Sequence, residues 1–405
     1  MASKKKTPRS LGRIKRGKPL IPKWKVFRAK EPVVSVFMWG VNHTIGELMH
    51  VPPPGLLMPD DFKAYAKIKI DYHAFNKDNM PSHFKIKDYC PNVFRNIREQ
   101  FGVDQSEYLI SLTSYEPEVD LHESSGASRL FVSYDRKFVI KVVDSEAVAE
   151  IHATLKDYHG YVVERHGKTL LPQFLGLYRV TVDNSDTYLL VMRNIFGGKY
   201  AIHKKYDLKG STVQRQASEK EKTKELPTLK DNDFLEDNDK LMLPADAKEQ
   251  LMSLLKSDTD FLTKLKLMDY SLLVGIHDVE QNKKEEAEAL AAQAHSSDPD
   301  SGEEVQTPPD SPVVSVGAFI SLTRDLNLDD EFFGIPSSSE SPKKLIYFIG
   351  LVDILTYYGV KKRTASAAKS VKYGSEAENI STVKPEQYAR RLLEFVNRNV
   401  SSPQN

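Results

Sequence analysis

The stretch Lys264–Asp278, KLKLMDYSLLVGIHD, places one carboxylate, Asp269, between a long amphipathic segment and an apolar run. A second carboxylate, Asp353, lies inside another apolar run, LIYFIGLVDIL, over 345–355. An unpaired buried carboxylate costs on the order of several kcal/mol, so apolar strands rarely carry one without a reason. Either acid alone is equally well explained as a hydrogen-bonded residue at a strand end. The segments around them favour a functional pair.

The segment before Asp269 predicts the best helix of the chain, over 246–268. Asp246 and Glu249 form a capping-box-like start. The apolar face comprises Leu251, Leu254, Leu255, Phe261, Leu262 and Leu265. This helix is expected to deliver Asp269 at its C-terminal end.

The first half of the chain predicts strands and helices in a fixed order. Residues 32–49 are apolar enough for a buried strand or helix, residues 60–87 indicate short strands, and 84–101 have the spacing of a helix. Next come a hairpin over 130–143, a helix over 145–158, a second hairpin over 174–191 and a connector over 192–198. A two-lobed phosphotransferase needs this order, with a lysine on the first strand pair.

Phosphoryl transfer needs cations on the phosphates, acids that hold magnesium and a group beside the attacking hydroxyl. Lys141 lies in an apolar strand, where taken alone it is as readily a surface lysine with a buried stem. The turn-prone residues 124–128, SSGAS, precede it and offer backbone N–H groups to a phosphate. The protein-kinase signatures HRDLxxxN and DFG are absent. The residues alone therefore indicate a kinase-like nucleotide enzyme.

Composition limits the class of protein. The chain has 405 residues, is 40% hydrophobic and 28% charged, and carries a net charge of +1, which fits one large or two modest domains. Its single cysteine, Cys90, excludes an intramolecular disulfide and a cysteine-based metal site. No apolar window approaches the roughly 18 residues of a spanning helix, and no secretory signal begins the chain. We expect a soluble, cytoplasmic protein.

Charge is strongly segregated along the chain. Residues 4–30 carry twelve lysines and arginines and no acid, which predicts a flexible arm, either solvated or in contact with an anionic surface. Residues 281–342 are acidic and of low complexity, which predicts a disordered insertion with Ser-Pro and Thr-Pro sites. No aromatic interleaving or nucleic-acid-binding motif accompanies the basic arm, so nucleic acid is not expected as a partner.

Three strings carry a resemblance to a known family. They are Lys205–Ser211 (KYDLKGS), Met268–Asp278 (MDYSLLVGIHD) and Val352–Leu355 (VDIL), and they resemble the signatures of the phosphatidylinositol phosphate kinases. The resemblance implies an α+β, two-lobed kinase-like fold with antiparallel sheets, packed helices and a flat basic membrane face. Its divisions would be a basic arm over 1–30, an N-terminal lobe over 31–200 with the dimerisation region and the nucleotide-binding sheet, and a catalytic lobe over 201–400 interrupted by 281–342.

Within this family the chain is most similar to the type II group, the phosphatidylinositol 5-phosphate 4-kinases. The strings over 58–63, 81–85 and 224–231 and the basic loop around Ala365 support this. Type I enzymes, which act on the 5-hydroxyl, have a glutamate where this chain has Ala365. Met192, which stands where some members have a threonine beside the base, favours ATP, with GTP as the alternative.

The resemblance implies a role for each matching residue. Asp269 would be the catalytic aspartate, Asp353 the magnesium-binding acid, and Lys141 a ligand of the nucleotide phosphates. Arg193, Asn194, Phe196 and Lys205 would surround the nucleotide. Substrate would be bound by Lys209, Arg215, Lys361, Lys362, Ala365, Lys369 and Lys372, the first two on the 5-phosphate and the rest in a loop on anionic lipid.

The expected partners follow from the same resemblance. They are a phosphoinositide substrate, an anionic membrane surface on the cytosolic side, and a second copy of the chain, paired through the apolar stretch Val33–Met49 unless that stretch is plain core. Heterodimers with related kinases and a nuclear location are alternatives. The rival functions are phosphatidylinositol 4-phosphate 5-kinase activity and a low-activity phosphoinositide-binding scaffold. The scaffold is suggested by SSGASRLF, a phosphate loop one residue longer than the family's usual pattern.

Overall fold

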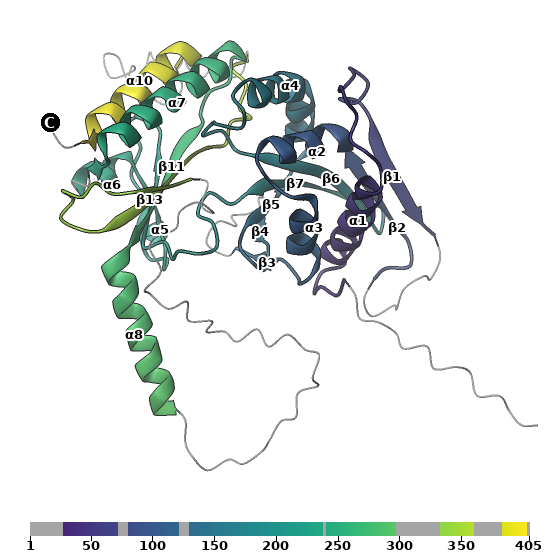
Figure 1. Ribbon diagram of the computed structural model, residues 1–405, viewed down its shortest axis with the longest axis horizontal. Coiled ribbons are helices and arrows are strands. Elements are labelled where there is room, and N and C mark those ends of the chain that lie inside the picture. Colours follow the sequence, from purple (N-terminus) through teal and green to yellow (C-terminus); the bar gives the residue numbers. More distant parts are fainter. Residues whose placement is uncertain are drawn as a thin grey trace, which may run out of the picture.

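The computed structural model describes residues 27–71, 80–120, 129–237, 240–296, 333–359 and 383–402. Two sheets with packed helices make an α+β fold, as predicted (Figure 1). The basic arm over 1–26, the loop over 124–128 and the loop residues Lys361, Lys362, Ala365, Lys369 and Lys372 lie outside the described ranges. In the described part of the chain, no helix has the length and apolar character needed to cross a bilayer.

The first sheet has seven antiparallel strands in the order β1-β2-β6-β7-β5-β4-β3. The strands are β1 (Tyr65–Ile70), β2 (Phe84–Tyr89), β3 (Glu118–Val119), β4 (Leu130–Val132), β5 (Phe138–Val143), β6 (Phe174–Val182) and β7 (Ser185–Arg193). Both predicted hairpins, β4–β5 and β6–β7, are confirmed. Their turns contain Arg136, Asp183 and Asn184 in left-handed backbone conformations.

Helices cover both faces of this sheet. They are α1 (Pro32–Met49), α2 (Pro91–Gln100), α3 (Gln105–Thr113) and α4 (Ser145–Glu164). Gly40 of α1 lies directly over Ile86 of β2, whereas His152 of α4 contacts the ring of Tyr89 at a centroid distance of 5.1 Å. Ile86 and Tyr89 are three residues apart on one strand and so point to opposite faces. The helices α1 and α4 therefore enclose the sheet between them.

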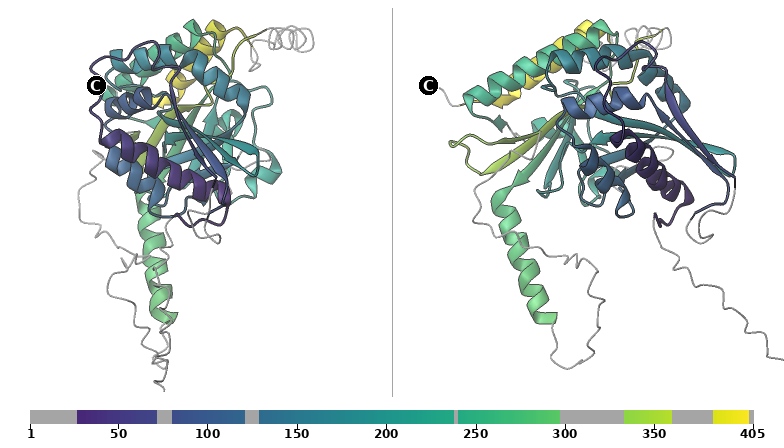
Figure 2. Two further views of the ribbon diagram at one scale, coloured as in Figure 1. Left: turned by 90° about the vertical axis from the view of Figure 1, so that its right-hand side faces the viewer. Right: turned by 45° about the vertical axis from the view of Figure 1, so that its right-hand side comes forward.

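The second sheet has five strands in the order β12-β13-β11-β8-β9. The strands are β8 (Lys204–Leu208), β9 (Thr228–Lys230), β11 (Ser271–Asp278), β12 (Gly334–Pro336) and β13 (Leu345–Val352). A parallel pair, β10 (Leu241–Met242) and β14 (Val400–Ser401), lies apart from it. The helices of this half are α5 (Glu219–Lys222), α6 (Asp231–Glu236), α7 (Ala245–Lys264), α8 (Val279–Ser296) and α10 (Pro385–Asn399). Figure 2 shows α7 and α10 running side by side and α8 projecting from the body.

A buried carboxylate joins the two halves at a point distant in sequence from the linker. Asp258 of α7 is fully buried and accepts hydrogen bonds from the Tyr161 hydroxyl (2.6 Å), the Thr169 hydroxyl (2.7 Å) and the Leu170 amide (2.6 Å). The Leu170 carbonyl in turn accepts a hydrogen bond of 2.7 Å from the amide of Leu351 in β13. We call Asp258, Tyr161, Thr169, Leu170 and Leu351 the inter-lobe bracket.

Several predicted elements differ from the observed ones. The helix predicted over 84–101 begins only at Pro91, because Phe84–Tyr89 alternates buried and less buried residues as a strand does. The helix predicted over 246–268 ends at Lys264, and its N-cap is Pro244, so the Asp246–Glu249 capping box is wrong. The insertion predicted over 281–342 is too long, because α8 extends through Ser296 and Phe333 is buried just before β12.

The apolar stretch Val33–Met49 forms α1, and it is core. Val36, Phe37, Val41 and Ile45 are almost completely buried within the same chain, against α3 and β6. The apolar face of α1 is therefore not available to pair two copies, which corrects that expectation.

Candidate active site between the two sheets

Asp269 and Asp353 lie at the same end of two adjacent strands. Ser271, the first residue of β11, pairs with Val352, the last residue of β13, in an antiparallel register. Asp269 precedes β11 by two residues and Asp353 follows β13 by one. The pairing resumes beyond them, where the Met268 amide donates to the Thr356 carbonyl at 2.9 Å. Residues 84 positions apart in sequence are thereby brought to one edge of the sheet.

Both acids have left-handed backbone conformations, with φ of 67° at Asp269 and 57° at Asp353. Aspartate adopts this region more readily than most residues but still at a cost. Such strain persists only where the surrounding structure fixes it, and it is concentrated at functional sites. The two predicted catalytic acids share this feature.

Lys141 connects the first sheet to this edge of the second. Its ammonium lies 2.8 Å from the Asp353 carboxylate, and the two side chains are 33% and 57% exposed. An ion pair this accessible to solvent contributes little stability. The lysine and the acid are therefore available to anionic phosphate and to a cation respectively.

Lys209 lies against the other acid. Its ammonium donates to the Asp269 carboxylate at 2.9 Å and to the Asp269 backbone carbonyl at 2.8 Å. A lysine ammonium has three N–H groups. Within the described residues Asp269 accepts from two of them, so the third is available to a ligand. The turn that carries Lys209 is held by buried Asp231, which accepts from the amides of Lys209 (3.0 Å), Gly210 (2.7 Å) and Ser211 (3.2 Å).

Arg215 is not an open phosphate ligand in this structure. Its guanidinium donates to Asp231 at 2.7 Å and also to Asp207, and the residue is 9% exposed. Burial acts to lower the pKa of Arg215, but the two carboxylates outweigh it and the pKa is raised. Arg215 therefore ties β8 to α6, and its contact with substrate stays a prediction.

The linker between the sheets packs closely on the second one. The Asn194 side chain donates to the Arg136 carbonyl at 2.7 Å and accepts from the Phe196 amide at 3.1 Å. A Cβ on Gly275 would lie 2.6 Å from the Phe196 ring, so only glycine allows this approach. Arg193, at the end of β7, donates to the Phe101 carbonyl at 2.8 Å.

Lys205 faces the same side of the second sheet as Phe196. It pairs with Gly275 across β8 and β11, and directly paired residues point to one face. Lys205 is only 2% exposed. The predicted neighbours Phe196 and Lys205 are thus brought together at the linker.

The donor set suits magnesium better than a closed metal cage. No group of three or more histidine, cysteine or acidic residues gathers as a metal site in the described ranges. Magnesium commonly uses one or two carboxylates and completes its shell with water and substrate phosphates. Asp353, half exposed beside Lys141, fits that requirement.

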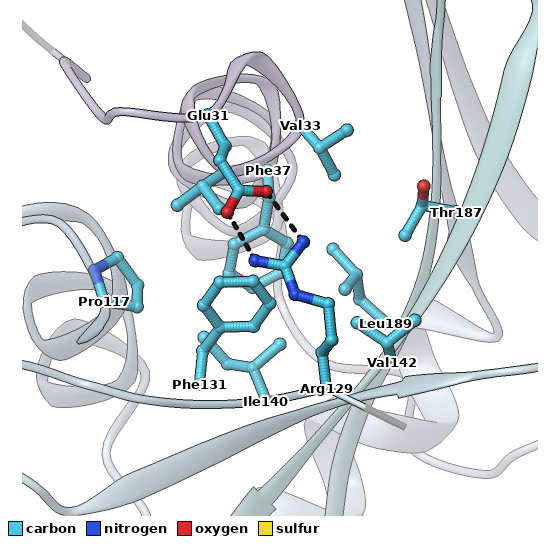
Figure 3. A pocket seen from close by; sticks show the side chains of 11 residues that line it. Glu31, Val33, Phe37, Pro117, Arg129, Phe131, Ile140, Val142, Thr187 and Leu189 are labelled. Atoms are coloured by element: carbon cyan, nitrogen blue, oxygen red, sulfur yellow. Dashed lines mark hydrogen bonds and ion pairs between the residues drawn. The ribbon is translucent and has the colours of Figure 1, made fainter. Parts of the chain in front are cut away.

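A separate cavity lies on the other face of the first sheet. It has a volume of about 170 Å³ and lies between α1 and strands β4, β5 and β7 (Figure 3). Ile140 and Val142 line it, so Lys141 between them points to the opposite face. Arg129 donates to Glu31 at its edge, which lowers the pKa of the Glu31 carboxyl. The cavity and the candidate site therefore lie on opposite faces of the first sheet.

Two residues of the site carried no usable signal in the sequence. Asp231 is one of several charged residues in its segment, and Tyr388 is an aromatic residue of α10, with no motif around either of them. The Tyr388 hydroxyl donates to the Tyr270 carbonyl, one residue from Asp269. Both act through contacts between segments far apart in the chain, which spacing does not reveal.

Comparisons of the sequence with known proteins point to one family. A family profile described as phosphatidylinositol-4-phosphate 5-kinase matches residues 116–399. The chain is 50% identical over 398 residues to phosphatidylinositol 5-phosphate 4-kinase type-2 alpha of Gallus gallus, covering 98% of this chain and 96% of that protein. It is 52% identical over 378 residues to the type-2 alpha protein of Homo sapiens, covering 92% of each chain. It is 51% identical over 385 residues to the human type-2 beta protein, covering 92% of this chain and 91% of the relative.

Proposed function

Because the chain belongs to the phosphatidylinositol-4-phosphate 5-kinase family, we propose that it phosphorylates the 4-hydroxyl of phosphatidylinositol 5-phosphate with ATP, giving phosphatidylinositol 4,5-bisphosphate. The observation that carries the proposal is the ion pair between Lys141 and Asp353, beside Asp269 at the same sheet edge. The 4-hydroxyl as acceptor rests on the type-2 relatives and on Ala365. GTP is the alternative phosphate donor.

In the proposed mechanism each charged residue has one task. Lys141 neutralises charge on the nucleotide phosphates, and Asp353 supplies an oxygen ligand for Mg²⁺, which when bound offsets charge on the transferred phosphate. Asp269 accepts the proton of the attacking inositol hydroxyl. The third N–H of Lys209 binds the 5-phosphate while the other two hold Asp269. Arg193, Asn194 and Phe196 border the nucleotide, with Lys205 beside them.

We propose that an anionic membrane surface meets the lysine-bearing side of β1 and β2, on which Lys67 and Lys69 are exposed. Lys67 lies directly opposite Lys87, and Lys69 opposite Lys85. Like charges in these positions destabilise a sheet, so an external anion is favoured beside Lys67 and Lys87, whereas Lys69 already forms an ion pair with Asp71 at 2.7 Å. Lys361, Lys362, Lys369 and Lys372 are the proposed partners of the same surface. The location that follows is peripheral, on cytosolic membrane faces, with the nucleus as a second site.

We further propose that the chain forms a homodimer through the segment between α1 and β1. Val51, Leu56, Met58 and Tyr65 are 56%, 75%, 56% and 56% exposed, and β1 is an edge strand of its sheet. Exposed apolar clusters and free strand edges both favour association. Light scattering on Leu56→Asp should report a monomer, and Leu290→Asp, at an apolar residue that is 45% exposed on α8, should stay dimeric. A dimer that survives Leu56→Asp contradicts this interface.

The decisive assay compares vesicles that contain either monophosphate isomer, with magnesium and ATP. Product from the 5-phosphate isomer, lost in Asp269→Asn, is the expected result. Product mainly from the 4-phosphate isomer would instead establish a 5-kinase, and vesicle binding without product from either isomer would establish the scaffold.

A further inference from the structure

We propose that Tyr388, on the C-terminal helix α10, is a positioning residue for Asp269 and acts through the backbone carbonyl of Tyr270. The inference deepens the proposed function and rests on it, because Asp269 is there the acceptor of the inositol proton. Tyr388 touches neither reacting group. Its task is to fix the turn on which the acid is carried.

The contact between Tyr388 and Tyr270 is buried. The Tyr388 hydroxyl donates to the carbonyl of Tyr270, and the two rings pack edge to face with centroids 4.9 Å apart. Both residues are fully buried. The peptide between Tyr270 and Ser271, where β11 begins, is thus anchored directly after the left-handed Asp269.

The same helix supports the turn that carries Lys209. Gly210 has φ of +67°, and a Cβ there would lie 2.9 Å from the Arg391 carbonyl oxygen and 2.9 Å from the Leu392 Cα. Arg391 and Leu392 follow Tyr388 by one turn of helix. One helical turn of α10 therefore presses on both segments whose side chains meet in the Lys209–Asp269 ion pair.

The donor remains protonated across the working pH range. Burial raises the pKa of Tyr388 well above its ordinary value, and the nearby Asp269 adds to the shift. The hydroxyl therefore keeps its hydrogen and donates it to the Tyr270 carbonyl throughout this pH range.

The chain offers matched controls. The Tyr270 hydroxyl is buried and accepts or donates no hydrogen bond within the described residues, so Tyr270→Phe removes a hydroxyl from the same ring pair without breaking a bond. Tyr108 is fully buried in the first half of the molecule, where its hydroxyl bonds that of Tyr178 at 3.2 Å. Tyr108→Phe therefore controls for the loss of a buried tyrosine hydrogen bond far from Asp269.

The first measurement is steady-state kinetics of the full chain on vesicles with each monophosphate isomer. We expect Tyr388→Phe to lower kcat about tenfold, the effect of one hydrogen bond, with the KM for ATP kept within about twofold. The loss in Tyr270→Phe should be at least about fivefold smaller, and Tyr108→Phe should keep its kcat.

The second measurement is hydrogen exchange of the peptide that spans 266–271, which does not depend on activity. Exchange should become about tenfold faster in Tyr388→Phe and not in Tyr270→Phe. If the parent turns over neither isomer, the proposed function fails while this readout still decides the positioning role. Unchanged exchange in Tyr388→Phe or an equal kcat loss in Tyr270→Phe would each overturn the inference.

Discussion

At the scale of single residues, the site is built on two aspartates that hold an unfavourable backbone conformation. Asp269 and Asp353 are both left-handed, and each is paired with a lysine, Lys209 and Lys141. Asparagine tolerates the left-handed region as well as aspartate does, so an Asp→Asn change removes charge without adding backbone strain. This makes the neutral amide the informative substitution at both positions.

Asp353→Asn should reduce phosphate transfer at least about a hundredfold, because it removes the proposed magnesium ligand from beside Lys141. Its melting temperature should stay within about 2 °C of the parent, since the exposed Lys141–Asp353 pair contributes little stability. Initial rates over a range of magnesium concentrations, with a parallel thermal melt, test both statements. Retained turnover would remove Asp353 from the mechanism.

The buried carboxyl of Asp88 makes the stability of the protein depend on pH. Burial raises the pKa of Asp88, which is 2% exposed, to about 7, although Arg98 opposes the shift. In the unfolded chain this carboxyl loses its proton near pH 4, whereas in the folded protein it keeps the proton up to about pH 7. The free energy of unfolding therefore falls as pH rises from about 4 to about 7. Asp88→Asn cannot ionise. Relative to the parent, its melting temperature should therefore be higher at pH 8 than at pH 5, and an equal difference at both values would contradict the shift.

Three residues of the candidate site could be singled out from the sequence. Lys141, Asp269 and Asp353 stand out because charge is rare in apolar strands, and the structure brings all three to one edge. The resemblance predicted Arg215 as a substrate ligand, yet two acids from different segments, Asp207 and Asp231, enclose it. These ion pairs depend on which turns meet in space, and the local sequence does not reveal them.

At the scale of elements, glycines divide into those that permit contact and those that only weaken a helix. Gly275 and Gly350 allow Phe196 and Ile195 of the linker to lie on the second sheet, with virtual Cβ distances of 2.6 Å and 2.9 Å. Gly160, inside α4, would meet nothing within 4 Å. Periodicity predicted the two hairpins and the long helices α4 and α7, but it left 32–49 open between strand and helix and wrongly predicted helix for 84–89. The starts of α2 and α7 were set by Pro91 and Pro244.

Alanine substitutions at these glycines should have opposite effects. Gly160→Ala should raise the free energy of unfolding by about 0.5–1 kcal/mol through helix propensity alone. Gly275→Ala should displace the Phe196 ring, lower stability and raise the KM for ATP. Thermal melts and nucleotide titrations of the two variants provide the comparison, and a neutral Gly275→Ala would show that the linker does not depend on this contact.

At the scale of the whole molecule, the inter-lobe bracket couples two halves that each have their own sheet. Asp258→Asn keeps the size of the side chain but weakens its three hydrogen bonds, and a bond to a buried carboxylate contributes about 1.5–3 kcal/mol. We expect a melting temperature lower by several degrees and a less cooperative calorimetric transition. Asp260→Asn is the control on the same helix, because its pair with Lys256 is 60% exposed on both sides and should contribute almost nothing. Equal effects of the two variants would show that the bracket has no special role.

The bracket also affects the position of Asp353. The linker and the bracket hold the same short stretch of β13, because Ile195 of the linker lies on Gly350 and the Leu170 carbonyl accepts a hydrogen bond from the amide of the next residue, Leu351. Asp353 follows this stretch by two residues and pairs with Lys141 of the first sheet. A shift of β13 at either contact would therefore change the distance between the Asp353 carboxylate and the Lys141 ammonium.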